Sequence, residues 1–281
     1  MHPIGLKSVI FCLALFLIFK KVHSQIPFTQ DANGHILLQV KINGVNGKFI
    51  FDTGAGLNAI FTGFSKKIEN IRSSDTIHGQ RATGEELVLN LYNAQTITIG
   101  NKNFTGQQYA IIDLKAGDID GIISLQPFKT TPVTIDYLQH LIFFNQDSQG
   151  FSSIPIECSV SPKILDIHTD VLLNNSIKAK VELDSGAGQH SYWFAKKYMD
   201  SLGLDKADFD SITVKSDFGK SNVNYKGKIK SLSTVNKIIA IQDLNVSFVE
   251  GLIYDGKTSI DWIGKILTID IPQKKIFIKA R

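Results

Sequence analysis

The chain repeats itself, and this repeat limits the fold more than any other feature of its 281 residues. Residues 43–56 (NGVNGKFIFDTGAG) align without gaps on residues 175–188 (NSIKAKVELDSGAG), at an offset of 132. Two further pairs of segments match in the same order, at offsets of 130 and 134: 120–124 with 250–254, and 134–137 with 268–271. Three matches in one order at nearly constant spacing predict two related lobes instead of one continuous core.

Most of the remaining patterns are typical of β-strands. Segments rich in β-branched and aromatic residues alternate with turn-forming residues such as Asn43–Gly47. The strands expected in the first half are 36–42, 48–51, 87–91, 95–99, 109–112, 133–135 and 141–144. Those expected in the second half are 171–173, 179–183, 212–215, 229–232, 246–249, 267–269 and 275–278. Helices are expected only at Tyr192–Leu202 and Ala59–Ile68, so the fold class is all-β with few short helices.

The first 24 residues have the pattern of a secretory signal. A basic start is followed by twelve uncharged residues, Ser8–Phe19, and by small residues at Val22 and Ser24. Twelve residues are too few for a membrane span, which needs about 20. We therefore expect residues 1–24 to be removed, a secreted or periplasmic protein, and no stable membrane insertion. The rest divides into a lobe at 25–148, a linker at 149–162 rich in polar residues, Gly and Pro, and a lobe at 163–281.

Charge and metal-ligand patterns exclude several classes of function. Three of the 30 basic residues lie in the expected signal, which leaves 27 against 26 acidic ones, so no nucleic-acid partner is expected. Cys158 is the one cysteine outside the signal, and the histidines have no metal-ligand spacing. The acidic cluster Asp113–Asp120 lacks the last ligand of a calcium loop. We expect no metal, no cofactor and a monomer.

The repeated motif places an aspartate directly after an apolar strand in each half. A carboxylate there is costly unless it is paired or solvated. If the lobes pack about a pseudo-twofold axis, Asp52 faces Asp184, and two such carboxyls share one proton. Such a pair can deprotonate a water for attack on a carbonyl and return a proton to the leaving nitrogen. The alternative is that both aspartates only cap turns, because Asp before Gly is a common turn sequence.

These residues resemble a known family. The segments Asp52-Thr-Gly-Ala and Asp184-Ser-Gly-Ala, each with a downstream Gly-apolar-Ile segment, are similar to the retropepsin-like aspartic proteases, in particular to secreted bacterial forms with two units in one chain. The resemblance implies two pseudo-twofold-related β-barrel lobes and peptide or protein substrates. It also implies that Asp52 and Asp184 form the catalytic dyad, supported by Thr53, Gly54, Ser185 and Gly186.

The family resemblance further implies hairpin flaps over a peptide-binding cleft. The candidates are Ile77–Leu87, with Gly79 and Gly84, and Val214–Tyr225, with Gly219. One departure from the family is expected where a glycine usually follows the downstream apolar pair. The alignment places Ser124 there in the first half and Tyr254 in the second. This departure supports an alternative function, a catalytically impaired peptide-binding protein of the same fold.

A competing motif is Gly251–Thr258, which satisfies the phosphate-loop pattern G-x-x-x-x-G-K-[ST], with Lys257 and Thr258 as the phosphate and magnesium residues. Too little chain follows it to complete a nucleotide-binding fold. We therefore predict an exported aspartic endopeptidase, with nucleotide binding as a weaker alternative. Ala55 and Ala187 stand where related pepsin-like enzymes have a hydroxyl residue. Without that hydroxyl the dyad should titrate higher, which predicts activity from weakly acidic toward neutral pH.

Overall fold

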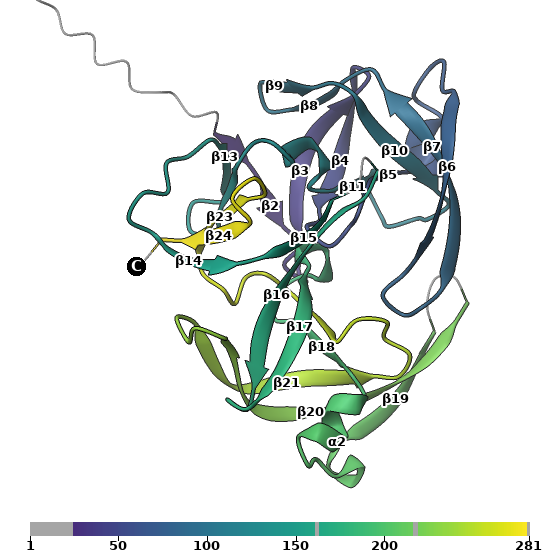
Figure 1. Cartoon of the computed structure of the whole chain (residues 1–281). Coiled ribbons are helices and arrows are strands. Elements are labelled where there is room, and N and C mark those ends of the chain that lie inside the picture. The colour runs from purple at the N-terminus through teal and green to yellow at the C-terminus, as the bar shows by residue number, and fades with distance from the viewer. Residues whose placement is uncertain (1–24, 161–162, 216–218, 280–281) are drawn as a thin grey trace, which may run out of the picture.

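The computed structural model describes residues 25–160, 163–215 and 219–279, and these residues form the all-β fold that the sequence predicts (Figure 1). Within them the α-helices are short: α1 (Thr62–Ser65) and α2 (Lys197–Ser201). Single 3₁₀ turns occur at η1 (Gln126–Phe128), η2 (Ser185–Ala187) and η3 (Lys206–Asp208). The expected signal peptide lies outside the described residues. No described helix has the length and apolar character that crossing a membrane requires.

The first lobe is built on one large sheet, drawn purple to teal in Figure 1. In hydrogen-bonding order its strands are β6 (Ser73–Gln80), β7 (Glu86–Ala94), β10 (Gln107–Ile112), β5 (Asn58–Phe61), β11 (Gly121–Ile123), β4 (Val45–Phe51), β3 (Ile36–Ile42), β8 (Ile97–Ile99) and β9 (Lys102–Phe104), with β2 (Thr29–Gln30) beside β3. The inward residues of β4, Phe49 and Phe51, are fully buried, and Phe51 packs edge-on against Phe128 of η1. This aromatic packing fixes the end of β4, from which Asp52 emerges.

The second lobe repeats this strand order. It runs β15 (Glu157–Val160), β16 (Leu165–Leu173), β17 (Ile177–Leu183), β22 (Gly256–Thr258), β18 (Tyr192–Ala195), β21 (Ala240–Val249), β20 (Ser221–Thr234) and β19 (Asp210–Lys215). Strand β16 alternates strictly between buried and half-buried residues, as expected for a strand with one face on the core. It also pairs with β20, which closes the sheet on itself.

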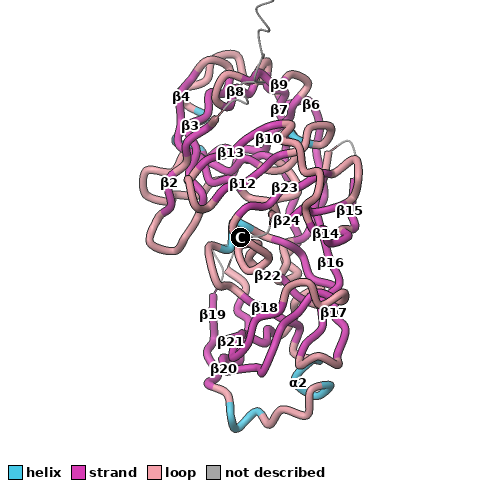
Figure 2. The backbone as a smooth tube through the Cα atoms, turned by 90° about the vertical axis from the view of Figure 1, so that its left-hand side faces the viewer, coloured by secondary structure: helices cyan, strands magenta, loops and turns pink. Residues whose placement is uncertain are grey.

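A third sheet joins the lobes. Its order is β1 (Ile26–Pro27), β13 (Leu141–Phe144), β12 (Val133–Asp136), β23 (Ile266–Asp270), β24 (Lys275–Ile278) and β14 (Ser152–Pro155). At its centre β12 and β23 run antiparallel with Thr134 opposite Thr268, and their hydroxyl oxygens are 2.8 Å apart. These threonines belong to the segments that match at an offset of 134. Figure 2 shows this sheet between the upper and lower parts of the molecule.

Three local expectations differ from the structure. Tyr192–Ala195 is a strand paired with β21 and β22, so only the end of the expected helix at Tyr192–Leu202 is helical, in α2. The same holds for Ala59–Ile68, which begins as β5 and continues as α1. In both places the aromatic and apolar residues are buried by neighbouring strands, and this pairing outweighs a short helical periodicity. The segment expected as a linker, 149–162, contains β14 and β15.

The alignment of the second matched segment is wrong. Gly121 of β11 lies opposite Phe49 of β4, whereas Val181 of β17, the counterpart of Phe49, lies opposite Gly256. The partner of Gly121 is therefore Gly256, at an offset of 135, and Gly251 lies in the preceding turn with φ of 76°. Because Gly251-Leu-Ile resembles Gly121-Ile-Ile in sequence, the alignment stopped five residues early. The counterpart of Ser124 is Ser259, and Tyr254 does not occupy the position expected for it.

Candidate active site

The two motif aspartates emerge from equivalent strand ends. Asp52 follows β4, and its N–H donates to the carbonyl of Ile123 in β11 at 2.9 Å. Asp184 follows β17, and its N–H donates to the carbonyl of Thr258 in β22 at 2.8 Å. In each lobe the strand before the aspartate is parallel to the strand that holds it. Parallel pairing buries both strands, so each aspartate is held at a rigid edge.

Hydroxyl groups next to the aspartates cross from lobe to lobe. Thr53 Oγ1 donates to the carbonyl of Leu183 at 2.7 Å and accepts the N–H of Ser185 at 3.0 Å. Reciprocally, Ser185 Oγ donates to the carbonyl of Phe51 at 2.8 Å and accepts the N–H of Thr53 at 3.0 Å. Both side chains are almost completely buried. These four bonds hold the two loops face to face.

The glycines of the motifs let the carboxyls meet. A Cβ built on Gly54 would lie 2.6 Å from Cγ of Asp184, and one built on Gly186 would lie 2.2 Å from Cγ of Asp52. The carboxyls of Asp52 and Asp184 are hydrogen-bonded to each other. Backbone N–H groups complete the arrangement. Those of Gly54 and Ala55 donate to Asp52 Oδ1 at 2.9 and 3.0 Å, and that of Ala187 donates to Asp184 Oδ1 at 3.1 Å.

The two carboxyls differ in their affinity for a proton. Burial and the neighbouring charge of Asp184 raise the pKa of Asp52 well above its usual value. Burial opposes ionisation of Asp184 as well, but the ammonium of Lys257 and a hydrogen bond from Asp52 outweigh it and lower the pKa of Asp184. One proton is therefore shared unequally, with Asp52 as the acid and Asp184 as the ionised partner.

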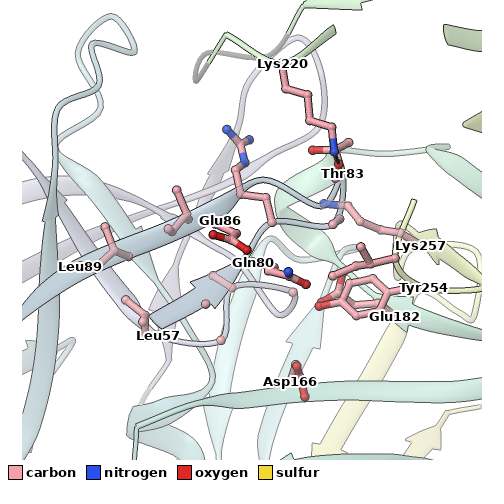
Figure 3. A pocket seen from close by; sticks show the side chains of 18 of the residues that line it. Leu57, Gln80, Thr83, Glu86, Leu89, Asp166, Glu182, Lys220, Tyr254 and Lys257 are labelled. Atoms are coloured by element: carbon pink, nitrogen blue, oxygen red, sulfur yellow. Dashed lines mark hydrogen bonds between the residues drawn. The ribbon is translucent and has the colours of Figure 1, made fainter. Parts of the chain in front are cut away.

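A cavity of about 1010 Å³ opens beside the dyad, between the lobes (Figure 3). Leu57 and Leu89 line it from the first lobe, and Glu182, Tyr254 and Lys257 line it from the second. Both candidate flaps are antiparallel hairpins that border this cavity, β6 with β7 and β19 with β20.

The flap glycines take different places. Gly79 lines the cavity from β6, Gly84 lies in the turn before β7 with φ of 78°, and Gly219 precedes β20 with φ of 91°. Gly84 and Gly219 are not among the residues that line the cavity. Positive φ favours glycine at both positions, so their role is in the shape of the hairpin turns.

The turn of the first flap reaches the second lobe. The N–H of Ile253 donates to the carbonyl of Ala82 at 2.9 Å, and Lys220 Nζ donates to the carbonyl of Thr83 at 2.6 Å. Lys220 and Thr83 are seen together above the cavity in Figure 3. The cavity is therefore covered by backbone from one lobe that is hydrogen-bonded to the other.

Sequence reasoning missed two charged residues of this site. Lys257, in the middle of β22, forms an ion pair with Oδ2 of Asp184, and Glu182, opposite Lys257 on β17, is only 4% exposed. Burial raises the pKa of Glu182 to about 8, with a smaller contribution from Asp184 and an opposing one from Lys257. The signal was present as Asp-Gly-x-x-Ser, which occurs at Asp120–Ser124 and Asp255–Ser259. Aligning these two segments places Lys257 beside the dyad.

The phosphate-loop interpretation of Gly251–Thr258 does not fit the structure. Its last three residues form strand β22, and no helix begins in the described residues that follow Thr258. A phosphate loop needs the N-terminus of a helix and a free lysine. Lys257 is held by Asp184 instead. Tyr254 of the same segment packs edge-on against His168, with ring centroids 5.4 Å apart.

Comparison with known families agrees with this geometry. Residues 38–126, which carry the Asp52 motif, β11 and the first flap, match the family described as aspartyl protease. This part of the chain is an aspartyl protease domain. The match supports peptidase activity in general terms and covers the first lobe. No curated protein matches the chain. Within the described residues, no group of three or more His, Cys, Asp or Glu side chains is placed to hold a metal ion.

Proposed function

We propose that this protein is an exported aspartic endopeptidase that hydrolyses peptide bonds with one dyad, Asp52 and Asp184, shared between its two lobes. The observation that carries the proposal is the mutual hydrogen bond of these two carboxyls at the wall of the interlobe cavity. The aspartyl protease match of residues 38–126 supports the reaction class. Peptides and proteins are the proposed substrates, and the lobes are proposed as 25–148 and 163–281.

The unequal sharing of the proton suggests the role of each carboxyl. Ionised Asp184 accepts a proton from a water whose oxygen bonds to the peptide carbonyl carbon, while the Asp52 proton passes to the carbonyl oxygen. In the second step the C–N bond breaks. Asp184 returns its proton to the leaving nitrogen, and Asp52 takes one from a hydroxyl of the tetrahedral intermediate. Both carboxyls end in their starting states, so no cofactor is required.

Cleavage within a chain is supported by the way the cavity is covered. Residues of both lobes line it, and the turn of the first flap crosses it to Ile253. A substrate strand that lies beneath this flap would be held on both sides of the dyad. Edges of β6 and β19 near the cavity offer backbone groups for such a strand.

The decisive experiment compares charge-removing variants of the dyad. The full chain is expressed with its N-terminal segment, the exported form is purified, and cleavage of a peptide library is followed by mass spectrometry. Asp52→Asn and Asp184→Asn should each lower kcat/KM by about 10³-fold or more, since general acid–base catalysis contributes up to about 10⁴-fold. Asp113→Asn, at an exposed position away from the cavity, is the matched control. Unchanged cleavage in Asp52→Asn would refute the proposal.

The pH dependence follows from the directions of the two pKa shifts. The active dyad carries one proton, so activity should rise as Asp184 ionises and fall as Asp52 loses its proton. The pKa of Asp184 is lowered and that of Asp52 is raised, which widens the active range on both sides. The pH profile of kcat/KM should therefore extend from weakly acidic toward neutral pH. A profile confined to a peak near pH 2 would contradict this assignment.

A second candidate is peptide binding without cleavage in the same cavity. Its specific support is now the ion pair of Lys257 with Asp184, since the replacement of a family glycine by Tyr254 has lost its basis. Binding of library peptides to the unmodified protein without any cleaved product would favour this candidate.

A further inference from the structure

Lys257 contacts one member of the dyad only. Its Nζ pairs with Oδ2 of Asp184, while Oδ1 of the same carboxyl accepts the N–H of Ala187 at 3.1 Å. The Lys257 side chain is 22% exposed and that of Asp184 is 3% exposed. An ion pair this close to fully buried is formed largely out of water, where charges interact more strongly than at the surface. Lys257 therefore acts directly on the charge of Asp184.

The first lobe has no equivalent of this lysine. Ile122 of β11 lies opposite Ile50 of β4, in the same register as Lys257 opposite Glu182 in the second lobe. Asp52 thus receives backbone N–H groups from Gly54 and Ala55 but no ammonium group. Two carboxyls with equivalent strands and equivalent loops differ in one charged neighbour.

The surroundings of Lys257 keep it charged. Asp184 and Glu182 approach it from the end of β17, and Asp52 faces it from the loop after β4. From β18 the ring of Trp193 lies 5.8 Å from its ammonium. Three carboxyls and one aromatic face favour the cationic form, and their effect exceeds the cost of burial, which by itself would lower the pKa of Lys257.

A second shell of groups lies on the far side of Glu182. Asp166 and His168 come from β16, and Tyr254 comes from the segment before β22. Asp166 adds negative charge beside Glu182 and makes its ionisation harder. Since the negative charge around Glu182 is not balanced by a second lysine there, Lys257 is the cation on which this side of the dyad depends.

We infer that Lys257 is the positioning residue that makes Asp184 the ionised carboxyl of the dyad and so places the shared proton on Asp52. The consequence for catalysis rests on the proposed function, whereas the placement of the proton does not. In a symmetric dyad either carboxyl could carry the proton. Here one strand residue decides, and the roles of acid and base are assigned to the first and second lobe respectively.

The test reads the protonation of each carboxyl without a substrate. The protein is labelled with ¹³C at the aspartate carboxyls, and the signals of Asp52 and Asp184 are assigned from Asp52→Asn and Asp184→Asn. In the unmodified protein Asp184 should titrate below Asp52. In Lys257→Met the titration of Asp184 should move upward by about 1 to 3 pH units, the range expected for loss of an adjacent cation. Lys257→Arg should keep the position of the unmodified protein.

Lys180→Met is the matched control, because Lys180 lies on β17 but pairs with exposed Glu157. It removes the same charge and should leave both titrations in place. Should Lys257→Met fail to fold, Lys257→Gln removes the charge, keeps hydrogen-bond donors and carries the same expectation. An unchanged Asp184 titration in the folded variant, or an equal shift in Lys180→Met, would overturn the inference.

Cleavage provides a separate measurement. If the protein is a protease, the acid limb of kcat/KM in Lys257→Met should move upward by the same 1 to 3 units, since that limb follows ionisation of Asp184. A purely structural lysine would lower activity equally at all pH values. Absence of cleavage in every form would refute the proposed function and leave the carboxyl titration as it is, so the two failures are distinguishable.

Discussion

The two halves of the cavity have the same strands in the same order but opposite chemistry beside the dyad. Ile50 and Ile122 face each other across β4 and β11 in the first lobe, and Glu182 and Lys257 take their places across β17 and β22 in the second. The backbone around the aspartates is the same in kind, with N–H groups, glycines and crossing hydroxyls on both sides. The comparison teaches that the scaffold requires symmetry and the chemistry of the dyad tolerates its loss.

The largest effect should come from the symmetric part, at the glycines that let the carboxyls meet. Gly186→Ala would place a Cβ 2.2 Å from Cγ of Asp52, and Gly54→Ala would place one 2.6 Å from Cγ of Asp184. Each should lower the free energy of unfolding by about 4 kcal/mol or more, because the clash involves a rigid buried loop. Urea denaturation measures this. Gly63→Ala in α1 has open space and is the control; an equal loss there would contradict the expectation.

The next effect should come from the asymmetric part, at Glu182. Its pKa is about 8 when folded and near 4.5 when unfolded, so between these values the folded state holds a proton that the unfolded chain releases. Stability should therefore fall as pH rises from about 4.5 to 8, by up to about 4 kcal/mol. Glu182→Gln should remove this fall.

Thermal unfolding of both proteins at a series of pH values checks the Glu182 prediction. Glu69→Gln, at an exposed position, should keep the dependence of the unmodified protein. Parallel curves for the unmodified protein and Glu182→Gln would mean that Glu182 is ionised in the folded state, and the two halves of the cavity would then differ less than their residues suggest.

The smallest effect tests whether the crossing hydroxyls are equivalent. Thr53→Val and Ser185→Ala each remove one donated and one accepted hydrogen bond between the lobes. Each should cost about 2 kcal/mol of unfolding free energy, and the double variant less than the sum, because the bonds belong to one network. Ser211→Ala, exposed on β19, is the control. A large inequality between the two single variants would show that one lobe supports the dyad more than the other.

Sequence reasoning succeeded where local pattern and tertiary contact agree. The alternation of β16, the hairpin at Asn43–Gly47 and the apolar runs before both aspartates predicted strands that the structure contains. It failed at Tyr192–Ala195, where aromatic residues four apart are typical of a helix but are buried here between β21 and β22. Local periodicity cannot register a neighbouring strand that comes from more than fifty residues away.

The sequence by itself determined the all-β class, the two copies of the Asp-Thr/Ser-Gly-Ala motif and the residues able to brace them, because strands, tight turns and short hydroxyl side chains are local properties. The role of Lys257 was decided only by the tertiary structure. In sequence Lys257 completes a phosphate-loop pattern, and the register of β22 on β17 sets it beside Asp184. Strand register is fixed by packing across the whole lobe, and a shift of one residue would have turned the lysine to the opposite face of the sheet.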